Sequence, residues 1–452
     1  MHAGGGVTGH MLVRLSTDGG STWADKVDHI AYADGLNFNS VAIDPNLSTK
    51  VAAVSLRDRF TQTVNLEFVY STDAGVTWAT ANSTPAAPDA DYWSIAYKKS
   101  SGSSGNPSQT VFIVGHDDYL GGGATNLRGW VVKSTNAGAN WQLGYTFPAG
   151  VNFRSIVIDP VNQGTMYAGY VHGSGLSAGG IYKTPDDGLH WSNLPLPATG
   201  STHDVTALVH DPNHSNVLYM AEQADPGVWK VSMTADGGST WSVLSTGLPS
   251  STSINHLVFN TNLTSGECPQ YLYAATDNGV YRMSLNVVLT YQTYSQWNMM
   301  AVPNEVCDFS KASVWPGSAS AASRYDVNCQ CYVATNPLKT GEGYFIKWNS
   351  VTNLSYTGWP FYNYAMQVAA GWNLIGSISN DVSTASIIQD PPNNVISNYF
   401  TETGSGYSVI TSLTHGLGAW VKVNQNGTLT VPSSAPKVSA QTTSLLTSTS
   451  SP

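Results

Sequence analysis

The sequence predicts an all-β protein, with an N-terminal β-propeller of about six blades over residues 1–287 and two tandem β-sandwich-like repeats after it. Three observations lead to this prediction. An eight-residue turn pattern begins at positions 16, 71, 134, 184 and 234, and these spacings are typical of one four-stranded blade. Alternating apolar strands flank the copies. From about residue 290 that pattern stops, and a different tandem repeat begins.

Each copy of the turn pattern has Asp or Asn at its third position and Trp at its eighth. The Asp or Asn oxygen can accept turn amides, the glycine at position five supplies a positive φ, and the Trp is expected to cap the layer between blades. These pairs are Asp18 and Trp23, Asp73 and Trp78, Asn136 and Trp141, Asp186 and Trp191, and Asp236 and Trp241.

Between the turns a second pattern recurs, an apolar strand that ends in Asp-Pro. It occupies residues 40–45, 155–160 and 207–212. Four strands per unit, repeated radially, make a propeller, whose last blade normally closes with strands from both termini. We count six blades, the first incomplete at its N-terminal side, with five or seven as alternatives if the sequence is truncated.

The second half of the chain contains a tandem duplication. Residues 296–301 match residues 371–376, and residues 341–347 match residues 416–422. We therefore expect one β-module over residues 290–366 and another over 367–432. Residues 433–452 follow as a tail in which eleven of twenty residues are Ser or Thr, so the tail is expected either to be disordered or to act as an assembly element, for instance a strand added to a neighbouring copy.

The composition of the chain indicates its cellular compartment and excludes some classes of partner. Only 11% of residues are charged, against roughly 25% in an ordinary soluble domain, which favours an extracellular or cell-surface protein. The net charge of −10 and the absence of a basic cluster argue against nucleic acid and anionic membranes as partners. No apolar run approaches the ~18 residues of a membrane span. The start at Met1 lacks the features of a signal peptide, so we expect that the signal has been removed or that the sequence is truncated.

Four cysteines lie in the second half of the chain: Cys268, Cys307, Cys329 and Cys331. An even number favours disulfides in an oxidising compartment, and Cys307 is expected to bridge to Cys329 or Cys331. Because Cys-x-Cys without a nearby His offers too few ligands, no structural zinc site is expected.

The five turns resemble the Asp-box, or BNR, repeat, S-x-D-x-G-x-T-W. Sialidases, xyloglucanase-type glycoside hydrolases, sortilin-type sorting receptors and photosystem II assembly factors contain such repeats, and the resemblance implies a structural role for the box. The strands of residues 150–284 look most like the assembly-factor and xyloglucanase branch. The two C-terminal modules resemble those appended to large bacterial surface proteins.

No complete catalytic set is evident. A sialidase-like site needs three arginines from different blades, and the propeller arginines do not offer that arrangement. A glycosidase needs two carboxylates across a cleft. Outside the repeated turns, the candidates are Asp117, Asp118 and Asp204, the last beside His203. The segment His116, Asp117, Asp118 and Tyr119 is also a candidate ligand loop, although a plain polar hairpin tip is the simpler interpretation.

The leading hypothesis is therefore a non-catalytic secreted or cell-surface protein that binds a protein or glycan, associates with itself and serves as an interaction or structural subunit, for example of a filament or coat. No cofactor and no metal are expected. The alternative is a glycoside hydrolase of the Asp-box propeller type that uses a pair of Asp residues.

Overall fold

The computed structural model describes residues 10–15, 24–30, 38–55, 68–80, 90–117, 128–173, 176–196, 200–212, 214–244, 248–249, 251–259, 271–362, 364–432 and 444–446. The chain divides into two compact units, residues 1–257 with 274–279, and residues 258–273 with 280–452. No helix among the described residues is long and apolar enough to cross a membrane.

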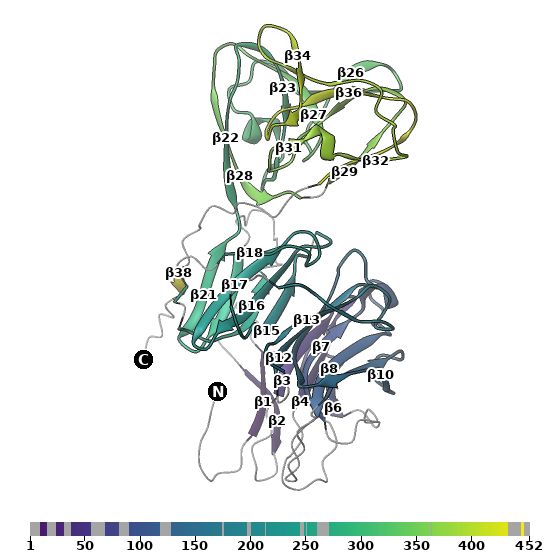
Figure 1. Cartoon of the computed structure of the whole chain (residues 1–452), viewed down its shortest axis with the longest axis vertical. Helices are drawn as coiled ribbons and strands as arrows, with labels where there is room; N and C mark the ends of the chain where they lie inside the picture. The colour runs from purple at the N-terminus through teal and green to yellow at the C-terminus, as the bar shows by residue number, and fades with distance from the viewer. Residues whose placement is uncertain are drawn as a thin grey trace. The chain divides into compact units, whose positions relative to one another are not determined.

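The N-terminal part is a series of small antiparallel sheets, as expected for a propeller (Figure 1). The first sheet has two strands, β1 (His10–Leu15) and β2 (Ala24–Ile30). Four complete sheets follow, each with its strands side by side in chain order: β3 (Phe38–Asp44), β4 (Leu47–Ser55), β5 (Phe68–Ser71) and β6 (Ala79–Thr80); β7 (Ala90–Tyr97), β8 (Val111–Asp117), β9 (Arg128–Ser134) and β10 (Gln142–Ala149); β11 (Val151–Ile158), β12 (Met166–His172), β13 (Gly180–Thr184) and β14 (Ser192–Asn193); and β15 (Asp204–His210), β16 (Leu218–Asp225), β17 (Val228–Thr234) and β18 (Ser242–Val243). A short 3₁₀ helix, Lys99–Ser101, lies between β7 and β8.

The innermost strands of neighbouring sheets pack on one another, β3 on β7, β7 on β11 and β11 on β15. Side chains on these strands also bond to the next strand. The Ser94 hydroxyl accepts the amide of Ile156 at 3.2 Å, and the Ser155 hydroxyl accepts the amide of Leu208 at 3.1 Å. The radial order predicted from the repeats is thus held by contacts from blade to blade.

The box turns, our name for the described copies of the eight-residue turn, share two hydrogen bonds, from the amide at position seven to the Asp or Asn side chain and from the amide at position five to the Ser or Thr hydroxyl. In residues 71–78, the Thr77 amide donates to Asp73 Oδ1 at 2.8 Å, the Gly75 amide to Ser71 Oγ at 2.7 Å, and Trp78 Nε1 to the Gly75 carbonyl at 3.1 Å. The same carboxyl or amide contact recurs in the turns at residues 134–141, 184–191 and 234–241. The first copy, with Asp18 and Trp23, lies outside the described residues.

In each described box turn the glycine at position five has the expected positive φ, and the residue before it is left-handed as well, which the sequence pattern did not reveal. Ala74 has φ of 58° and Gly75 has φ of 85°, and the pair Ala137 and Gly138 repeats this at 60° and 93°. The tryptophans reach across to a neighbouring sheet. The ring of Trp141, for example, meets the ring of Phe68 on β5 edge-on at 5.1 Å.

The last propeller sheet is completed from the far end of the chain. Its strands are β19 (Ile254–Phe259), β20 (Tyr271–Thr276), β21 (Gly279–Ser284) and β38 (Ser444–Leu446). In β38, Leu446 pairs with Val280 and Ser444 with Arg282, antiparallel (Figure 1). Three residues of the Ser/Thr-rich tail therefore form a strand within their own chain. Association between copies of the chain stays a prediction.

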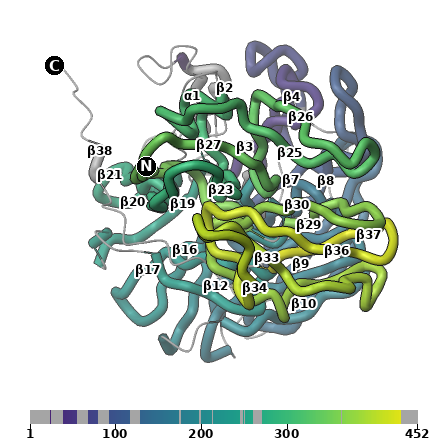
Figure 2. Tube along the Cα trace, turned by 90° about the horizontal axis from the view of Figure 1, so that it is seen from above, coloured from purple at the N-terminus to yellow at the C-terminus, as the bar shows by residue number. Residues whose placement is uncertain are grey.

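The duplicated modules share a strand plan of a three-stranded and a four-stranded sheet, to which the second module adds a two-stranded sheet. The first contains β22 (Val287–Gln292), β23 (Gln296–Ala301), β24 (Asn304–Glu305), helix α1 (Lys311–Val314), β25 (Ser323–Asp326), β26 (Cys331–Ala334), β27 (Gly343–Trp348) and β28 (Asn353–Pro360). The second contains β29 (Tyr364–Val368), β30 (Gly371–Ile375), β31 (Val382–Ser383), a 3₁₀ helix (Thr384–Ser386), β32 (Ile388–Asp390), β33 (Tyr399–Glu402), β34 (Tyr407–Ile410), β35 (Ser412–Leu413), β36 (Ala419–Val423) and β37 (Gly427–Val431). Figure 2 shows β30, β36, β33 and β34 as one layer of the second module.

The register of the strands confirms the duplication at the level of single residues. Gln296 pairs with Trp348, and at the matching positions of the second module Gly371 pairs with Val423. Each module also has its own apolar core, built around Trp315, Tyr344 and Trp348 in the first and around Ile378, Val421 and Leu429 in the second.

The expected bridge from Cys307 to Cys329 or Cys331 is wrong. Cys329 and Cys331 are bonded to each other at the end of the β25 to β26 hairpin, where the backbone brings their Cα atoms to 5.2 Å, within the usual range for a disulfide. Cys307 is also disulfide-bonded. Cys268 lies outside the described residues.

Candidate functional site

The two ends of each propeller sheet differ in what they present. Because the strands are antiparallel, the first strand of a sheet starts at the end of the sheet where the second strand finishes. The box turns lie at the opposite end. We call the end where β3, β7, β11 and β15 begin the start face, and the end with the box turns the turn face. The candidate carboxylates Asp117 and Asp204 both fall on the start face, since Asp117 ends β8 opposite Ala90 and Asp204 begins β15 opposite Gln223.

Asp204 is held by His172, the last residue of β12. Its Oδ1 accepts the His172 backbone amide at 2.7 Å and lies 2.8 Å from His172 Nδ1. The Asp204 side chain is 13% exposed and that of His172 is 36% exposed. A Cβ atom at Gly179 would approach Asp204 Oδ1 to 2.8 Å and the His203 carbonyl to 2.7 Å, so glycine leaves room for this carboxylate. The arrangement is a well-oriented carboxylate beside a partly exposed imidazole.

A second imidazole and carboxylate pair lies next to the first. His203 Nδ1 is 2.9 Å from Glu222 Oε2, and the Ser232 hydroxyl donates to Glu222 Oε1 at 3.3 Å. The Glu222 side chain is fully buried. His203 has φ of 45°, a left-handed conformation that is costly for a residue with a side chain and that is often found at functional sites.

On the two sheets before that of Asp204, the start face contains the stacked rings of Trp93 and His116 and the guanidinium group of Arg154. The Arg154 guanidinium lies 3.6 Å from the centre of the Trp93 ring, a distance at which a cation and a ring attract each other. Trp93 in turn stacks on His116, with ring centres 6.0 Å apart. These contacts join β7, β8 and β11 at the same edge that contains Asp117.

The structure brings only part of the predicted site together. His116 is buried on β8 and packs on Trp93, so it does not lie at a polar hairpin tip. Asp117 is the last residue of that strand, whereas Asp118 and Tyr119 lie outside the described residues. Within the described ranges, no group of three His, Cys, Asp or Glu could hold a metal ion.

Sequence reasoning missed the partners of Asp204. His172 and Glu222 were not among the candidate residues, and His203 was noted only as the neighbour of Asp204. One signal was available, since Glu222 sits inside an apolar run on a strand whose neighbours Ala221 and Met220 are fully buried. A carboxylate in such a strand must have a polar partner.

The comparisons connect the chain to known proteins without assigning it to a family. No protein-family model matches it. A stretch of 99 residues is 32% identical to a xyloglucanase of Hypocrea jecorina (strain QM6a), covering 20% of this chain and 12% of that protein, so the chain spans only part of that relative. Among solved structures, the GH74 xyloglucanase from Xanthomonas campestris matches with a TM-score of 0.43 at 17% identity, over 88% of this chain and 56% of that one. YCF48 from Cyanidioschyzon merolae matches with a TM-score of 0.33 at 12% identity, over 87% and 95%.

These findings correct the leading hypothesis. The expectation of a non-catalytic interaction or structural protein is wrong, because the similar sequence belongs to a xyloglucanase. The expectation of a self-assembling filament or coat subunit is withdrawn with it. The β-propeller and the all-β fold class are confirmed, while the narrower assignment of the turns to the Asp-box repeat stays a prediction.

Proposed function

We propose that the propeller is a glycoside hydrolase that acts on a neutral, β-glucan type polysaccharide outside the cell. The observation on which this rests most is the oriented, partly buried carboxylate of Asp204 on the start face. The 99-residue similarity to a xyloglucanase supports the choice of substrate class.

Glycoside hydrolysis needs two carboxyl groups on opposite sides of the scissile bond, one to donate a proton and one to activate water or attack the sugar. In this proposal Asp204 is the group that activates water or attacks the sugar, because the His172 amide and imidazole fix its orientation. We assign the acid to Asp117 from its backbone position alone, since it ends β8 on the same face.

The test measures the release of reducing ends from xyloglucan, other β-glucans and arabinan by the purified full chain. Asp204→Asn and Asp117→Asn should each lower the rate by about 10²- to 10⁴-fold, the usual contribution of a positioned acid or base. Asp225→Asn is the matched control. Asp225 ends β16 on the same face, but its carboxylate accepts the Ser201 hydroxyl and amide, and its loss should leave the rate unchanged.

Two results would count against the proposal. One is a wild-type protein that releases no reducing ends from any of these polysaccharides. The other is an Asp204→Asn variant that hydrolyses its substrate as fast as the Asp225→Asn control. Thermal unfolding of all variants separates a lost reaction from a lost fold.

A further inference from the structure

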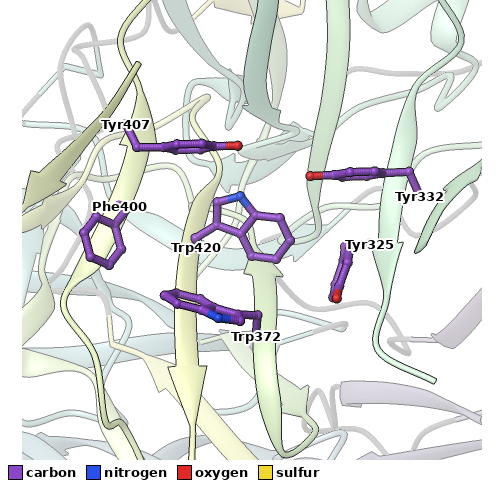
Figure 3. Close-up of a pocket in the computed structure, with 6 residues that line it drawn as sticks. All are labelled: Tyr325, Tyr332, Trp372, Phe400, Tyr407 and Trp420. Carbon is purple, nitrogen blue, oxygen red and sulfur yellow. The ribbon is translucent and has the colours of Figure 1, made fainter. Parts of the chain in front are cut away.

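The second unit contains an open hollow of about 460 Å³ that is lined by aromatic side chains (Figure 3). The six lining residues are Tyr325, Tyr332, Trp372, Phe400, Tyr407 and Trp420. Its volume falls within the ~300–1,000 Å³ of ordinary small-ligand sites. No lining residue carries a charge at neutral pH, so the hollow is suited to an uncharged ligand.

The hollow is a product of the tandem duplication. Tyr325 and Tyr332 come from β25 and β26 of the first module, and the other four residues come from β30, β33, β34 and β36 of the second. The two modules meet through backbone bridges between Glu342 and Ile375 and between Met300 and Leu417. Neither module could form this site alone.

The six rings are not core residues. None of them belongs to the apolar core of either module. On β36, Ala419 and Val421 are buried on one face, and Trp420 projects from the other. Trp372, Tyr332 and Tyr407 are 41%, 51% and 56% exposed. Large aromatic side chains gathered at a surface in this way commonly mark a binding site.

The rings are arranged around Trp420. Tyr325 meets it edge-on at 4.8 Å between ring centres, and Trp372 at 6.3 Å. Figure 3 shows Tyr332 and Tyr407 on either side of Trp420, with their hydroxyl groups directed towards each other. Burial, together with the neighbouring Tyr407 and Tyr325, raises the pKa of Tyr332 to about 12, so its hydroxyl keeps its proton as a donor.

A polar cleft adjoins the hollow. It measures about 620 Å³ and shares Tyr325 with the hollow. Arg324 and Asp326, paired at 3.1 Å, line it together with Gln367, whose amide donates to Thr428. A ligand longer than one ring would thus pass from stacking contacts to hydrogen-bonding groups.

We propose that this hollow binds pyranose rings of a neutral polysaccharide, as a non-catalytic site separate from the propeller. A pyranose has an apolar face of C–H bonds, which packs against the electron-rich face of an aromatic ring, and a rim of hydroxyl groups. Tyr hydroxyls and Trp N–H groups at the edges of the rings can bond to that rim. A charged ligand would find no partner in the lining, and an acyl chain would leave the inward tyrosine hydroxyls unbonded.

The chain itself offers a matched control. Trp297 is the counterpart of Trp372 in the first module, because it pairs with Lys347 as Trp372 pairs with Lys422. It is 48% exposed but does not line the hollow. Trp297→Ala therefore removes an equally exposed indole from the equivalent position of the first module and leaves the hollow complete.

The experiment is affinity electrophoresis of the full chain in gels that contain xyloglucan or hydroxyethylcellulose, with tryptophan fluorescence titration as a second readout. The choice of these probes rests on the proposed function, but the site does not. Trp372→Ala and Tyr407→Ala should each weaken binding at least tenfold, and Trp297→Ala should bind as the wild type does. Because Tyr407 is highly exposed, Tyr407→Ala should fold even if Trp372→Ala does not, and it then still tests the site.

The outcomes separate this site from the propeller. The hydrolysis-deficient Asp204→Asn variant should still bind, and Trp372→Ala should still hydrolyse soluble oligosaccharides at the wild-type rate. A wild type that binds without hydrolysing would refute the proposed function and support the site. Equal retardation of Trp372→Ala and Trp297→Ala, or binding of an apolar dye without any binding of polysaccharide, would refute the site.

Discussion

The turn face and the start face of the propeller use the same residue types in opposite ways. On the turn face, the carboxylate of Asp73 bonds to groups within its own turn, the Thr77 amide and hydroxyl and the Ser71 hydroxyl. On the start face, Asp204 bonds to His172, which lies 32 residues away in the chain. Asp73 therefore stabilises its own turn, whereas Asp204 is oriented by a residue of the neighbouring sheet and remains partly exposed.

The largest expected effect concerns the packing of the turn face. Gly75 and Gly138 occupy the same position of two box turns, with φ of 85° and 93°. A Cβ at Gly138 would lie 2.7 Å from the buried Phe68 ring, whereas a Cβ at Gly75 would meet nothing closer than 3.7 Å. Gly75→Ala should lower the free energy of unfolding by about 1–2 kcal/mol through left-handed strain alone. Gly138→Ala should cost about 2 kcal/mol more because of the collision. Urea unfolding of both variants measures the difference, and equal losses would show that the Phe68 contact is unimportant.

On the start face, the expected loss is somewhat smaller. Glu222→Gln replaces one carboxyl oxygen of a fully buried side chain that bonds to His203 and Ser232. Leaving a buried hydrogen-bonding group without its partner costs about 1–3 kcal/mol, so the free energy of unfolding should fall by about 2 kcal/mol. Asp225→Asn, at the end of the same strand, keeps an amide oxygen that can accept the hydrogen bonds of Ser201, so unfolding should change much less. Identical unfolding curves for the two variants would mean that the buried pair with His203 does not stabilise the blade.

The smallest expected effect depends on pH. Hydrogen bonds from Thr77 and Ser71 lower the pKa of Asp73 from 3.8 to about 2, and the contacts of His190 lower that of Asp186 to about 2 as well. Because the folded-state pKa lies below the unfolded value, the stabilisation is complete above about pH 4 and is lost as the pH falls towards 2.

Asp73→Asn tests this on the box turn at residues 71–78, since Asn136 already fills the same position in another turn. The variant should retain the turn and show a smaller fall in melting temperature between pH 4 and pH 2 than the wild type. Calorimetry across that range measures it. A variant with the same acid sensitivity as the wild type would contradict the assignment.

The same contrast explains which contacts could be predicted from the sequence and which could not. Box turns are local, so Asp73, Asp186 and Asp236 could be assigned their turn contacts from an eight-residue pattern. For the carboxylates of the Asp-Pro pattern, the sequence accounts for only some of the hydrogen bonds. Asp44 bonds to Asn46 as a turn residue should, but it also accepts the amide and hydroxyl of Ser108 from the next sheet. Contacts of the second kind depend on how blades are placed beside each other.

The aromatic hollow shows the same limit. The offset of the matching segments was visible in the sequence, and it matches Tyr325 with Phe400 and Tyr332 with Tyr407. The strand register agrees only with the second match, because Ser323 pairs with Phe345 where Phe400 pairs with Trp420, and Tyr325 pairs with Tyr332 where Glu402 pairs with Tyr407. Ser323 and Tyr325 therefore occupy the positions of Phe400 and Glu402. The hollow arises where two unequal copies meet, and a repeat comparison alone does not reveal that surface.

The pairing of β38 with β21 has a consequence for the order in which the protein is made. Strand β21 ends at Ser284 and β38 begins at Ser444, so both modules are synthesised between the two strands. At ordinary rates of synthesis, β21 waits on the order of ten seconds or more before its outer neighbour exists. During that interval an unpaired strand edge is open to any extended chain, including a nascent copy on an adjacent ribosome. The modules made in between therefore emerge while the propeller still lacks a strand, and that edge must stay apart from other chains until β38 has been made.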